Sequence, residues 1–186
     1  RSESELCDVF VRELTEGVDG VRAGVIGEIG ISDEYQRELV ALRAAGRAQA
    51  ATGAAIVIHP PGIKQAAPDM LKLLEREGAD ISKVVVGHCD WFWDEIDYLA
   101  NICARGANVC FDTFGLEVTL GHSLASPGDG ARIAAIRKLR DRGYIDAIVT
   151  GQDICFRSQY LRLGGNGYGH TLTNIRPTLL NNGLSQ

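Results

Sequence analysis

The stretch Val84-Val85-Val86-Gly87-His88-Cys89-Asp90 joins an apolar run to an imidazole and a carboxylate. Three consecutive β-branched residues favour a strand that is covered on both faces, as in a parallel sheet. Gly87 allows another group to approach the backbone closely, directly before His88. The stretch therefore predicts a buried strand over residues 83–88 with His88 at its carboxyl end.

Four further stretches repeat this pattern, each an apolar run that ends in a polar side chain. These runs end at Glu28, His59, Asp112 and Asp153. Helical spacing of apolar residues, with Gly or Pro at the boundaries, predicts helices between the strands. The expected strands are 23–29, 55–59, 83–88, 107–112 and 146–152, and the expected helices are 3–16, 34–52, 68–77, 92–104, one around Ile133–Leu139, and 170–182.

Strands that alternate with helices indicate an α/β fold with parallel strands and helical crossovers. Two architectures fit: an open doubly wound sheet, or part of a TIM (β/α)8 barrel. Polar groups at the ends of at least four strands favour the barrel, of which the chain would cover about five βα units. Gly27-Glu28-Ile29-Gly30 lacks the glycine spacing of a nucleotide-binding turn.

Composition narrows the class of partner. The 186 residues are 45% hydrophobic and 23% charged, which suits one domain with a substantial core. A net charge of −5, without a basic cluster, argues against nucleic acid and favours a small-molecule substrate. No apolar run reaches membrane-spanning length. Five cysteines without a Cys-x-x-Cys pair predict free, mostly buried thiols in a reducing compartment, so a cytoplasmic location is expected. A homodimer is left open.

The strand ends supply a set of metal-ligand residues. Glu28, His59 and His88 offer two imidazoles and one carboxylate, a common ligand set for catalytic Zn²⁺, and Asp153 adds a second anionic oxygen. Each residue alone would be interpreted as a hydrogen-bonded rim residue, but their shared position at strand ends favours a metal site. A mononuclear iron site made by two histidines and a carboxylate fits the same ligands.

Several motifs resemble the phosphotriesterase family of the amidohydrolase superfamily, in its phosphotriesterase-related branch. The similarity covers essentially the whole chain. It implies a metal-dependent hydrolase with a binuclear centre in which His59 and His88 bind one ion, Asp153 binds the other and Glu28 bridges them. The motifs are Ala23–Gly30, the strand that ends at His59, Val86–Asp90, Phe111–Thr113, Leu139–Gly143 and Gly167–His170.

The bridging position departs from the best-known members, which use a carboxylated lysine. Aligning Ala23-Gly24-Val25-Ile26 places that lysine at Gly27, one residue before Glu28. One step along a strand reverses the direction of the side chain, so Glu28 needs a local bulge to take over the bridge. The related branch carries Glu in the same local sequence, so the bridge is assigned to Glu28.

A second departure concerns the other metal, which the family binds with a His-x-His pair on the first strand. This sequence contains no His-x-His. The resemblance numbers the five strands as the fourth to the eighth, so residues 1–186 are expected to be a partial catalytic domain without the first three strands and the final segment. Such a piece exposes two sheet edges. Two Zn ions are expected in the intact enzyme, and at most one in this chain.

The leading functional hypothesis is hydrolysis of an ester, amide, lactone or phosphoester bond by a metal-activated hydroxide. Asp153 would be a metal ligand and the acceptor of the hydroxide proton, acting as general acid/base. The alternative is a non-catalytic binding module or incomplete half-site that binds metal or ligand without turnover. Specificity is expected in loops 113–128 and 154–169.

Other polar residues keep two interpretations each. Asp90 either orients a ligand or caps a helix, and Asp112 either lines the pocket or makes a structural hydrogen bond. His122 and Tyr168 are candidates for substrate contact, with a solvated loop as the alternative for His122. For His170, which belongs to a family motif, and for the aromatic run Trp91–Trp93, structural roles are favoured.

Overall fold

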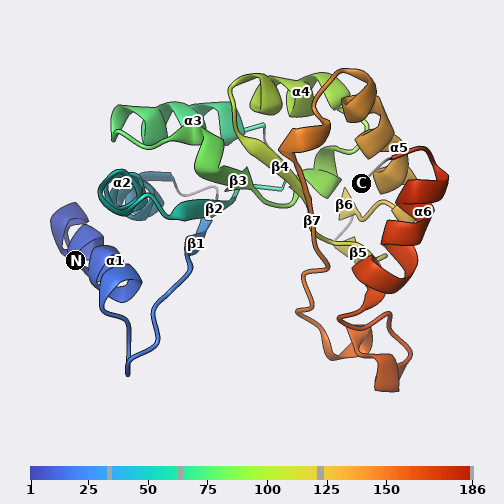
Figure 1. The fold of residues 1–186 in the computed structure, drawn as a ribbon, viewed down its shortest axis with the longest axis horizontal. Helices are drawn as coiled ribbons and strands as arrows, with labels where there is room; N and C mark the ends of the chain where they lie inside the picture. Colours follow the sequence, from blue (N-terminus) through green and yellow to red (C-terminus); the bar gives the residue numbers. More distant parts are fainter. Residues whose placement is uncertain (33–34, 63–64, 121–123, 185–186) are drawn as a thin grey trace. The chain divides into compact units, whose positions relative to one another are not determined.

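The computed structural model describes residues 1–32, 35–62, 65–120 and 124–184. Five strands form one sheet in the order β1-β2-β3-β4-β7, and helices alternate with them along the chain (Figure 1). The pairs β1–β2, β2–β3 and β4–β7 are parallel, which confirms the predicted α/β class. The strands are β1 (Val25–Gly30), β2 (Ala55–His59), β3 (Val84–Val86), β4 (Asn108–Phe111) and β7 (Ile148–Thr150).

The helices begin and end close to the sequence signals. Ser2 and Glu5 form a capping box at the start of the first helix, and Pro68 lies in the first turn of the third. The α-helices are α1 (Glu3–Thr15), α2 (Tyr35–Thr52), α3 (Ala67–Arg76), α4 (Ile96–Ala104), α5 (Asp129–Asp141) and α6 (Arg176–Asn181). Short 3-10 turns are η1 (Ile81–Lys83), η2 (Cys89–Phe92), η3 (Ile145–Ala147), η4 (Arg157–Gln159) and η5 (Leu161–Leu163).

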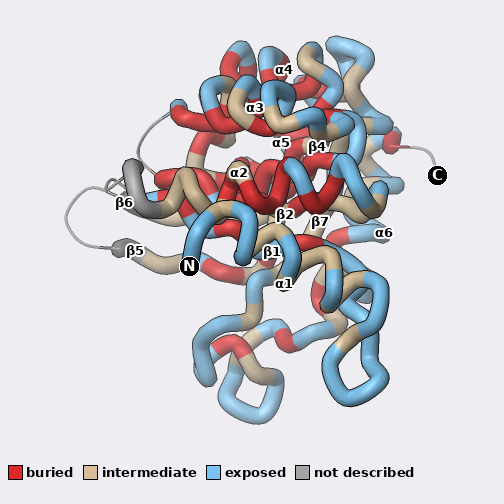
Figure 2. Tube along the Cα trace, turned by 90° about the vertical axis from the view of Figure 1, so that its left-hand side faces the viewer, coloured by how far each residue is buried: buried red, intermediate tan, exposed pale blue. Residues whose placement is uncertain are grey.

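The chain divides into two compact units, residues 1–87 with 101–108 and residues 88–100 with 109–186. In the first unit α2 packs against α1, α3, β1 and β2. Its core consists of aliphatic side chains, coloured as buried in Figure 2. They include Leu42, Ala45, Ile56, Ile58, Leu71, Leu74, Val84 and Val86.

The central strands differ in burial, because β4 has three consecutive buried residues, Val109–Phe111, whereas β2 and β3 alternate. In β3, Val84 and Val86 are buried whereas Val85 is half-buried, and in β2 Ile58 is buried whereas Val57 is half-buried. The prediction of strands covered on both faces is therefore confirmed for β4 and holds only in part for β2 and β3. β-Branched residues suit a half-covered pleated face as well as a buried one, so the apolar run did not distinguish the two.

The second unit departs from expectation in three places. Residues 113–128 contain an antiparallel pair, β5 (Thr119–Leu120) with β6 (Leu124–Ala125), where a loop was expected. The strand expected at 146–152 is limited to β7 because η3 precedes it. The last helix is divided into a π-helical segment, η6 (Thr171–Ile175), and α6.

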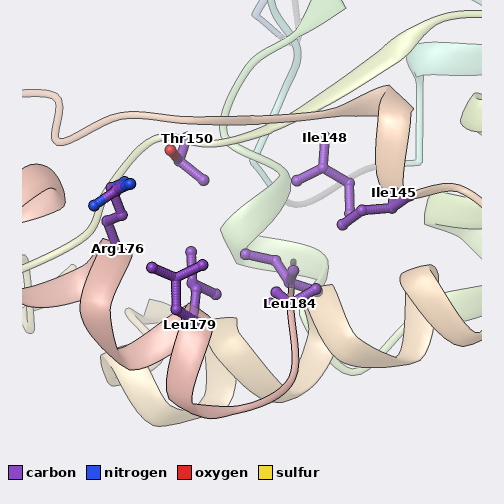
Figure 3. Close-up of a pocket in the computed structure, with 8 residues that line it drawn as sticks. Ile145, Ile148, Thr150, Arg176, Leu179 and Leu184 are labelled. Atoms are coloured by element: carbon purple, nitrogen blue, oxygen red, sulfur yellow. The ribbon is translucent and has the colours of Figure 1, made fainter. Parts of the chain in front are cut away.

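An apolar pocket of about 210 Å³ lies in this unit and is lined by residues of α5, η3, β7 and α6 (Figure 3). Arg176 and Thr150 provide its polar groups, and Ile148, Leu179 and Leu184 are among its apolar ones. None of the predicted site residues lines it. In the described part of the chain, no helix has the length and apolar character that crossing a bilayer requires.

Candidate metal centre

A bulge in β1 places Glu28. Ile26 pairs with Ile56, but the next pair is Ile29 with Ile58, so β1 contains one residue more than β2 over this interval. At Gly27, φ is 131° and a Cβ atom would lie 2.4 Å from the Val57 carbonyl oxygen. The irregularity that the Glu28 assignment requires is therefore present, and the backbone leaves no room for a lysine side chain at position 27.

His59 is the last residue of β2. Its Nδ1 atom lies 3.2 Å from the carbonyl oxygen of Pro60. Because a carbonyl only accepts, this contact favours the tautomer that carries its proton on Nδ1 and its lone pair on Nε2. The backbone at the end of β2 thus prepares His59 to bind an ion through Nε2.

His88 follows β3 after one residue. The Gly87 N–H donates to the Ile58 carbonyl over 2.9 Å, which continues the β2–β3 ladder up to the residue before His88. His88 itself is in the left-handed region, with φ 52° and ψ 31°. This conformation is uncommon for a residue with a Cβ atom, and such strain is concentrated at functional sites.

Ligand atoms of Glu28, His59 and His88 all lie within 4.8 Å of one another. Two imidazoles and a carboxylate at this spacing fit a divalent ion of the zinc type. His88 is buried, whereas Glu28 and His59 are exposed. The arrangement combines a fixed ligand with a side that is open to solvent, as a catalytic metal site with an open coordination position requires.

Asp112, directly after β4, holds His88. Its carboxylate lies 2.8 Å from His88 Nδ1 and accepts the His88 backbone N–H over 3.0 and 3.1 Å. Nδ1–H therefore donates to Asp112, and the lone pair of the ring lies on Nε2. Carboxylates that orient metal-binding histidines in this way raise their basicity as ligands. Of the two interpretations of Asp112, the structure shows the hydrogen bond, and it is made to a predicted ligand.

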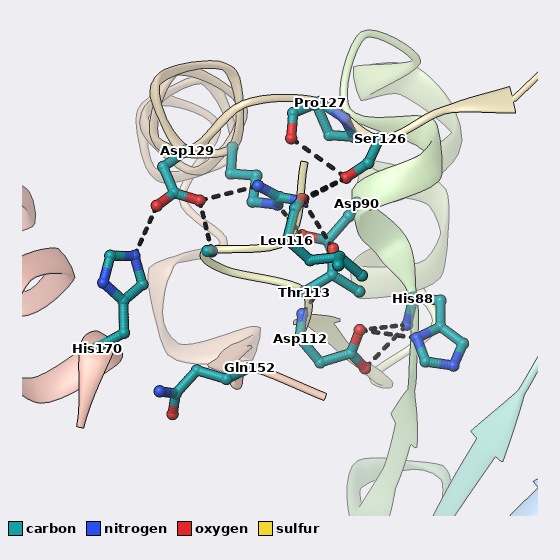
Figure 4. A network of polar contacts seen from close by, with 12 residues as sticks. His88, Asp90, Asp112, Thr113, Leu116, Ser126, Pro127, Asp129, Gln152 and His170 are labelled. Atoms are coloured by element: carbon teal, nitrogen blue, oxygen red, sulfur yellow. Dashed lines mark hydrogen bonds and ion pairs between the residues drawn. The ribbon is translucent and has the colours of Figure 1, made fainter. Parts of the chain in front are cut away.

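The Asp90 carboxylate accepts a hydrogen bond from the backbone of Asp112. Asp90 lies inside η2, whose N-cap residue is His88, so it does not cap that helix. Its Oδ2 accepts the Asp112 backbone N–H over 2.8 Å, and its Oδ1 lies 2.6 Å from Nε of Arg132 (Figure 4). Burial and the neighbouring Asp112 charge raise the pKa of Asp90 to about 6, although Arg132 opposes this shift.

Asp153 begins the loop that follows β7, and its φ of 39° is also left-handed. The buried side chain of Gln159 holds this loop: its amide donates to the carbonyls of Asp153 (3.2 Å) and Gln152 (3.4 Å). Its side-chain oxygen accepts the N–H groups of Cys155 (2.9 Å) and Phe156 (2.8 Å). The role of Asp153 as a ligand of a second ion and as the acid/base stays a prediction.

Tyr168 and His170 differ sharply in environment. Tyr168 is 70% exposed, its ring centroid lies 6.1 Å from that of Tyr160, and a hydrogen bond with Tyr160 raises its pKa. His170 is buried, with Nε2 2.7 Å from Asp129 and Nδ1 2.9 Å from the Asn174 amide. The ring of His170 is thus held by protein groups, as a structural role requires.

The remaining candidates are His122 and the aromatic run Trp91–Trp93. His122 lies outside the described residues. In the aromatic run, Phe92 is buried and packs on Tyr98 of α4 with ring centroids 4.8 Å apart, which favours a packing role.

Sequence reasoning missed Arg132, Asp129 and Gln159. Arg132 is fully buried on α5 and binds both Asp90 and Asp129. One signal was available, because Arg132 lies four and seven positions before Ile136 and Leu139 and thus shares their buried face. Arg137 and Lys138 of the same helix are exposed.

The sheet order, the alternating helices and the strand-end imidazoles and carboxylates define an α/β protein of the (β/α)-barrel class with a candidate metal centre. A sequence model of the phosphotriesterase family matches residues 1–186, and the chain belongs to that family.

Named relatives and a solved structure agree with this assignment. The chain is 39% identical to a phosphotriesterase-related protein of Nematostella vectensis over 188 residues, which cover 98% of this chain and 54% of the relative. It is 35% identical to human N-acetyltaurine hydrolase over 193 residues, covering 100% and 55%. The crystal structure of a resiniferatoxin-binding protein from Rhodobacter sphaeroides superposes with a TM-score of 0.96 at 35% identity, covering 100% of this chain and 53% of that one. The chain spans about half the length of these relatives.

Proposed function

We propose that the protein is a metal-dependent hydrolase that cleaves an ester, amide, lactone or phosphoester bond in a small molecule. The observation that carries the proposal is the cluster of Glu28, His59 and His88, whose ligand atoms lie within 4.8 Å of one another at adjacent strand ends. Family membership supports the same class of chemistry. One relative is named for hydrolysis of N-acetyltaurine, so the amide bond of an N-acylated acid is the first substrate to test.

A bound divalent ion would polarise the scissile bond and lower the pKa of a water ligand from 15.7 to about 7. The chain's own residues prepare the site for it. Pro60 and Asp112 hold the Nδ1 atoms of His59 and His88, so the ligand atom of each ring would be Nε2. Glu28 supplies the negative charge that offsets the ion.

Asp153 is proposed as the proton acceptor. A carboxylate at a strand end next to the reacting water can take its proton and return it to the leaving group. The Gln159 contact to the Asp153 carbonyl holds the backbone of this residue. The same proposal includes two zinc ions in the intact enzyme, at most one in this chain alone, and a cytoplasmic location.

Metal binding by site variants tests the ligand set. Zn²⁺ affinity is measured by competition with a chromophoric chelator for the wild type, His59→Ala, His88→Ala and Glu28→Gln. The matched control is Glu75→Gln, which removes a surface carboxylate that pairs with Arg105. We expect the three site variants to lose at least 100-fold in affinity and the control to match the wild type. Equal affinities in all five proteins would refute the metal centre.

Turnover is measured with N-acetyltaurine, a γ-lactone, 4-nitrophenyl acetate and a phosphotriester. Zn²⁺-dependent hydrolysis of at least one substrate, lost in His88→Ala, supports the hydrolase. The absence of His-x-His from the sequence favours one competing function, a half-site that binds metal without turnover. Tight binding of a single ion without hydrolysis of any of the four substrates would favour that half-site over the hydrolase.

A further inference from the structure

Arg132 of α5 has no solvent exposure, although it carries a full positive charge. Its guanidinium makes five contacts within 2.9 Å: Nε with Asp90, Nη1 with Asp129, and Nη2 with Thr113 Oγ1, the Leu116 carbonyl and Ser126 Oγ. The face of the Phe114 ring lies 5.8 Å from its central carbon. All of its donor nitrogens are therefore engaged.

A buried charge is costly unless it is paired, and here two carboxylates pair with it. Asp90 and Asp129 contact different nitrogens of the guanidinium, which is planar and rigid. The guanidinium therefore lies between the two carboxylates and fixes both of them. A lysine ammonium is a point donor and lacks the fork that reaches all of these acceptors at once. The site is therefore specific for arginine.

The contacts continue from Arg132 to the predicted metal ligand (Figure 4). Asp90 uses one oxygen for Arg132 and the other for the backbone N–H of Asp112, over 2.6 and 2.8 Å. Asp112 in turn holds the backbone and the ring of His88, with 2.8 Å between Oδ1 and Nδ1. Three hydrogen-bonded steps thus connect the first turn of α5 to the ring of His88.

The opposite side of Arg132 is anchored as well. Asp129 accepts the Gly115 N–H over 2.9 Å and pairs with His170 over 2.7 Å. Asn174 holds the other nitrogen of His170 over 2.9 Å. The guanidinium is thereby fixed from both directions, so Arg132 has little freedom to follow a displaced Asp90.

We propose that Arg132 is a positioning residue for His88. It fixes the carboxylate of Asp90, Asp90 fixes the backbone of Asp112, and Asp112 keeps the His88 proton on Nδ1, so that the lone pair of the ring is on Nε2. The consequence for metal affinity rests on the proposed function, whereas the consequence for the His88 tautomer does not.

The test reads the histidine rings directly. Long-range ¹H–¹⁵N spectra of the metal-free protein report the tautomer of each ring, and His59 serves as an internal control because Pro60 anchors it independently. The variants are Arg132→Met and Arg132→Lys. Arg140→Met is the matched control on the same helix, since Arg140 contacts Asp141 and the Gly183 carbonyl.

We expect Arg132→Met to move the Nδ1 and Nε2 signals of His88 toward a tautomer mixture, with those of His59 unchanged. Zn²⁺ affinity should fall about 10- to 100-fold, as is usual when the support of a metal ligand is removed. Arg132→Lys should recover part of both effects, and Arg140→Met should match the wild type. A folded Arg132→Met protein with a wild-type His88 tautomer and affinity within about twofold would overturn the proposal.

If Arg132→Met does not fold, Asp90→Asn replaces it. An amide at position 90 can accept from either Arg132 or the Asp112 N–H but meets the other with its own NH₂ group, so one contact is lost. The same His88 shift supports the proposal, and its absence overturns it. A shift of the His88 tautomer in a protein that binds no Zn²⁺ would support positioning and refute the metal centre. Zn²⁺-dependent turnover in variants whose His88 tautomer is unchanged would support the metal centre and overturn the positioning role of Arg132.

Discussion

Gly27→Ala is expected to damage the bulge that carries Glu28. The added Cβ atom would lie 2.4 Å from the Val57 carbonyl oxygen and 3.1 Å from the Ile29 nitrogen, both of them backbone atoms that cannot rotate away. The φ of 131° is itself strained for alanine, at about 1–3 kcal/mol. Relieving the overlap by separating β1 from β2 breaks one or two ladder hydrogen bonds, each about 1 kcal/mol. The expected loss is therefore about 2–5 kcal/mol in the free energy of unfolding.

Urea titration followed by circular dichroism measures this loss. Gly24→Ala and Gly30→Ala are matched controls, because a Cβ atom at either position meets nothing within 4 Å. Alanine in an accommodating backbone reduces the entropy of the unfolded chain, so the controls should equal or slightly exceed the wild type in stability. Folded Gly27→Ala protein should also have lost Zn²⁺ affinity. The reasoning is refuted if Gly27→Ala unfolds within about 0.5 kcal/mol of Gly24→Ala and binds Zn²⁺ as tightly.

Three further outcomes are expected. Exposed Cys155 should react with a thiol reagent in the native protein and buried Cys103 only after unfolding, as mass spectrometry of labelled peptides will show. Burial raises the pKa of Cys103 from 9.0 to about 11. The neutral thiol therefore stabilises the fold below pH 9, and this contribution is lost as the pH rises toward 11. The urea midpoint should fall over that window, and it should fall less in Cys103→Ala. Gln159→Leu leaves the N–H groups of Cys155 and Phe156 without their acceptor, which should cost about 1–3 kcal/mol and speed hydrogen exchange at both amides.

The strand order along the chain and the strand-end residues were readable from the sequence because two signals coincide. Apolar runs such as Val84–Val86 end in a polar group, and a glycine such as Gly53 or Gly106 ends the preceding helix in a left-handed conformation. Both signals act over a few residues, so no alignment is needed to detect them. The bulge at Gly27 was also anticipated, since Glu28 could take the bridging position only with an extra residue in β1.

What the sequence did not reveal depends on contacts between distant residues. Asp90 and Arg132 are 42 positions apart, and although its spacing places Arg132 on the buried face of α5, nothing in the sequence identifies Asp90 as its partner. The pair β5–β6 is equally hidden, because two-residue strands have too few side chains to show alternation. How far the faces of β2 and β3 are covered depends on which elements pack against them. The composition of a strand does not predict those elements.

Two of the predicted ligands, His88 and Asp153, each follow a strand and each have a positive φ. A left-handed residue turns the chain sharply at the strand end, and for a residue with a Cβ atom that conformation costs about 1–3 kcal/mol unless its surroundings hold it. Each turn has its own polar support, the half-buried Asp112 for His88 and the buried Gln159 for the carbonyl of Asp153. Because these supports bind backbone atoms as well as side chains, their removal should release the turn before it alters the ligand's chemistry. The precision of the proposed centre therefore depends on residues that never touch an ion, and variants at those positions should separate positioning from ligation more cleanly than variants of the ligands themselves.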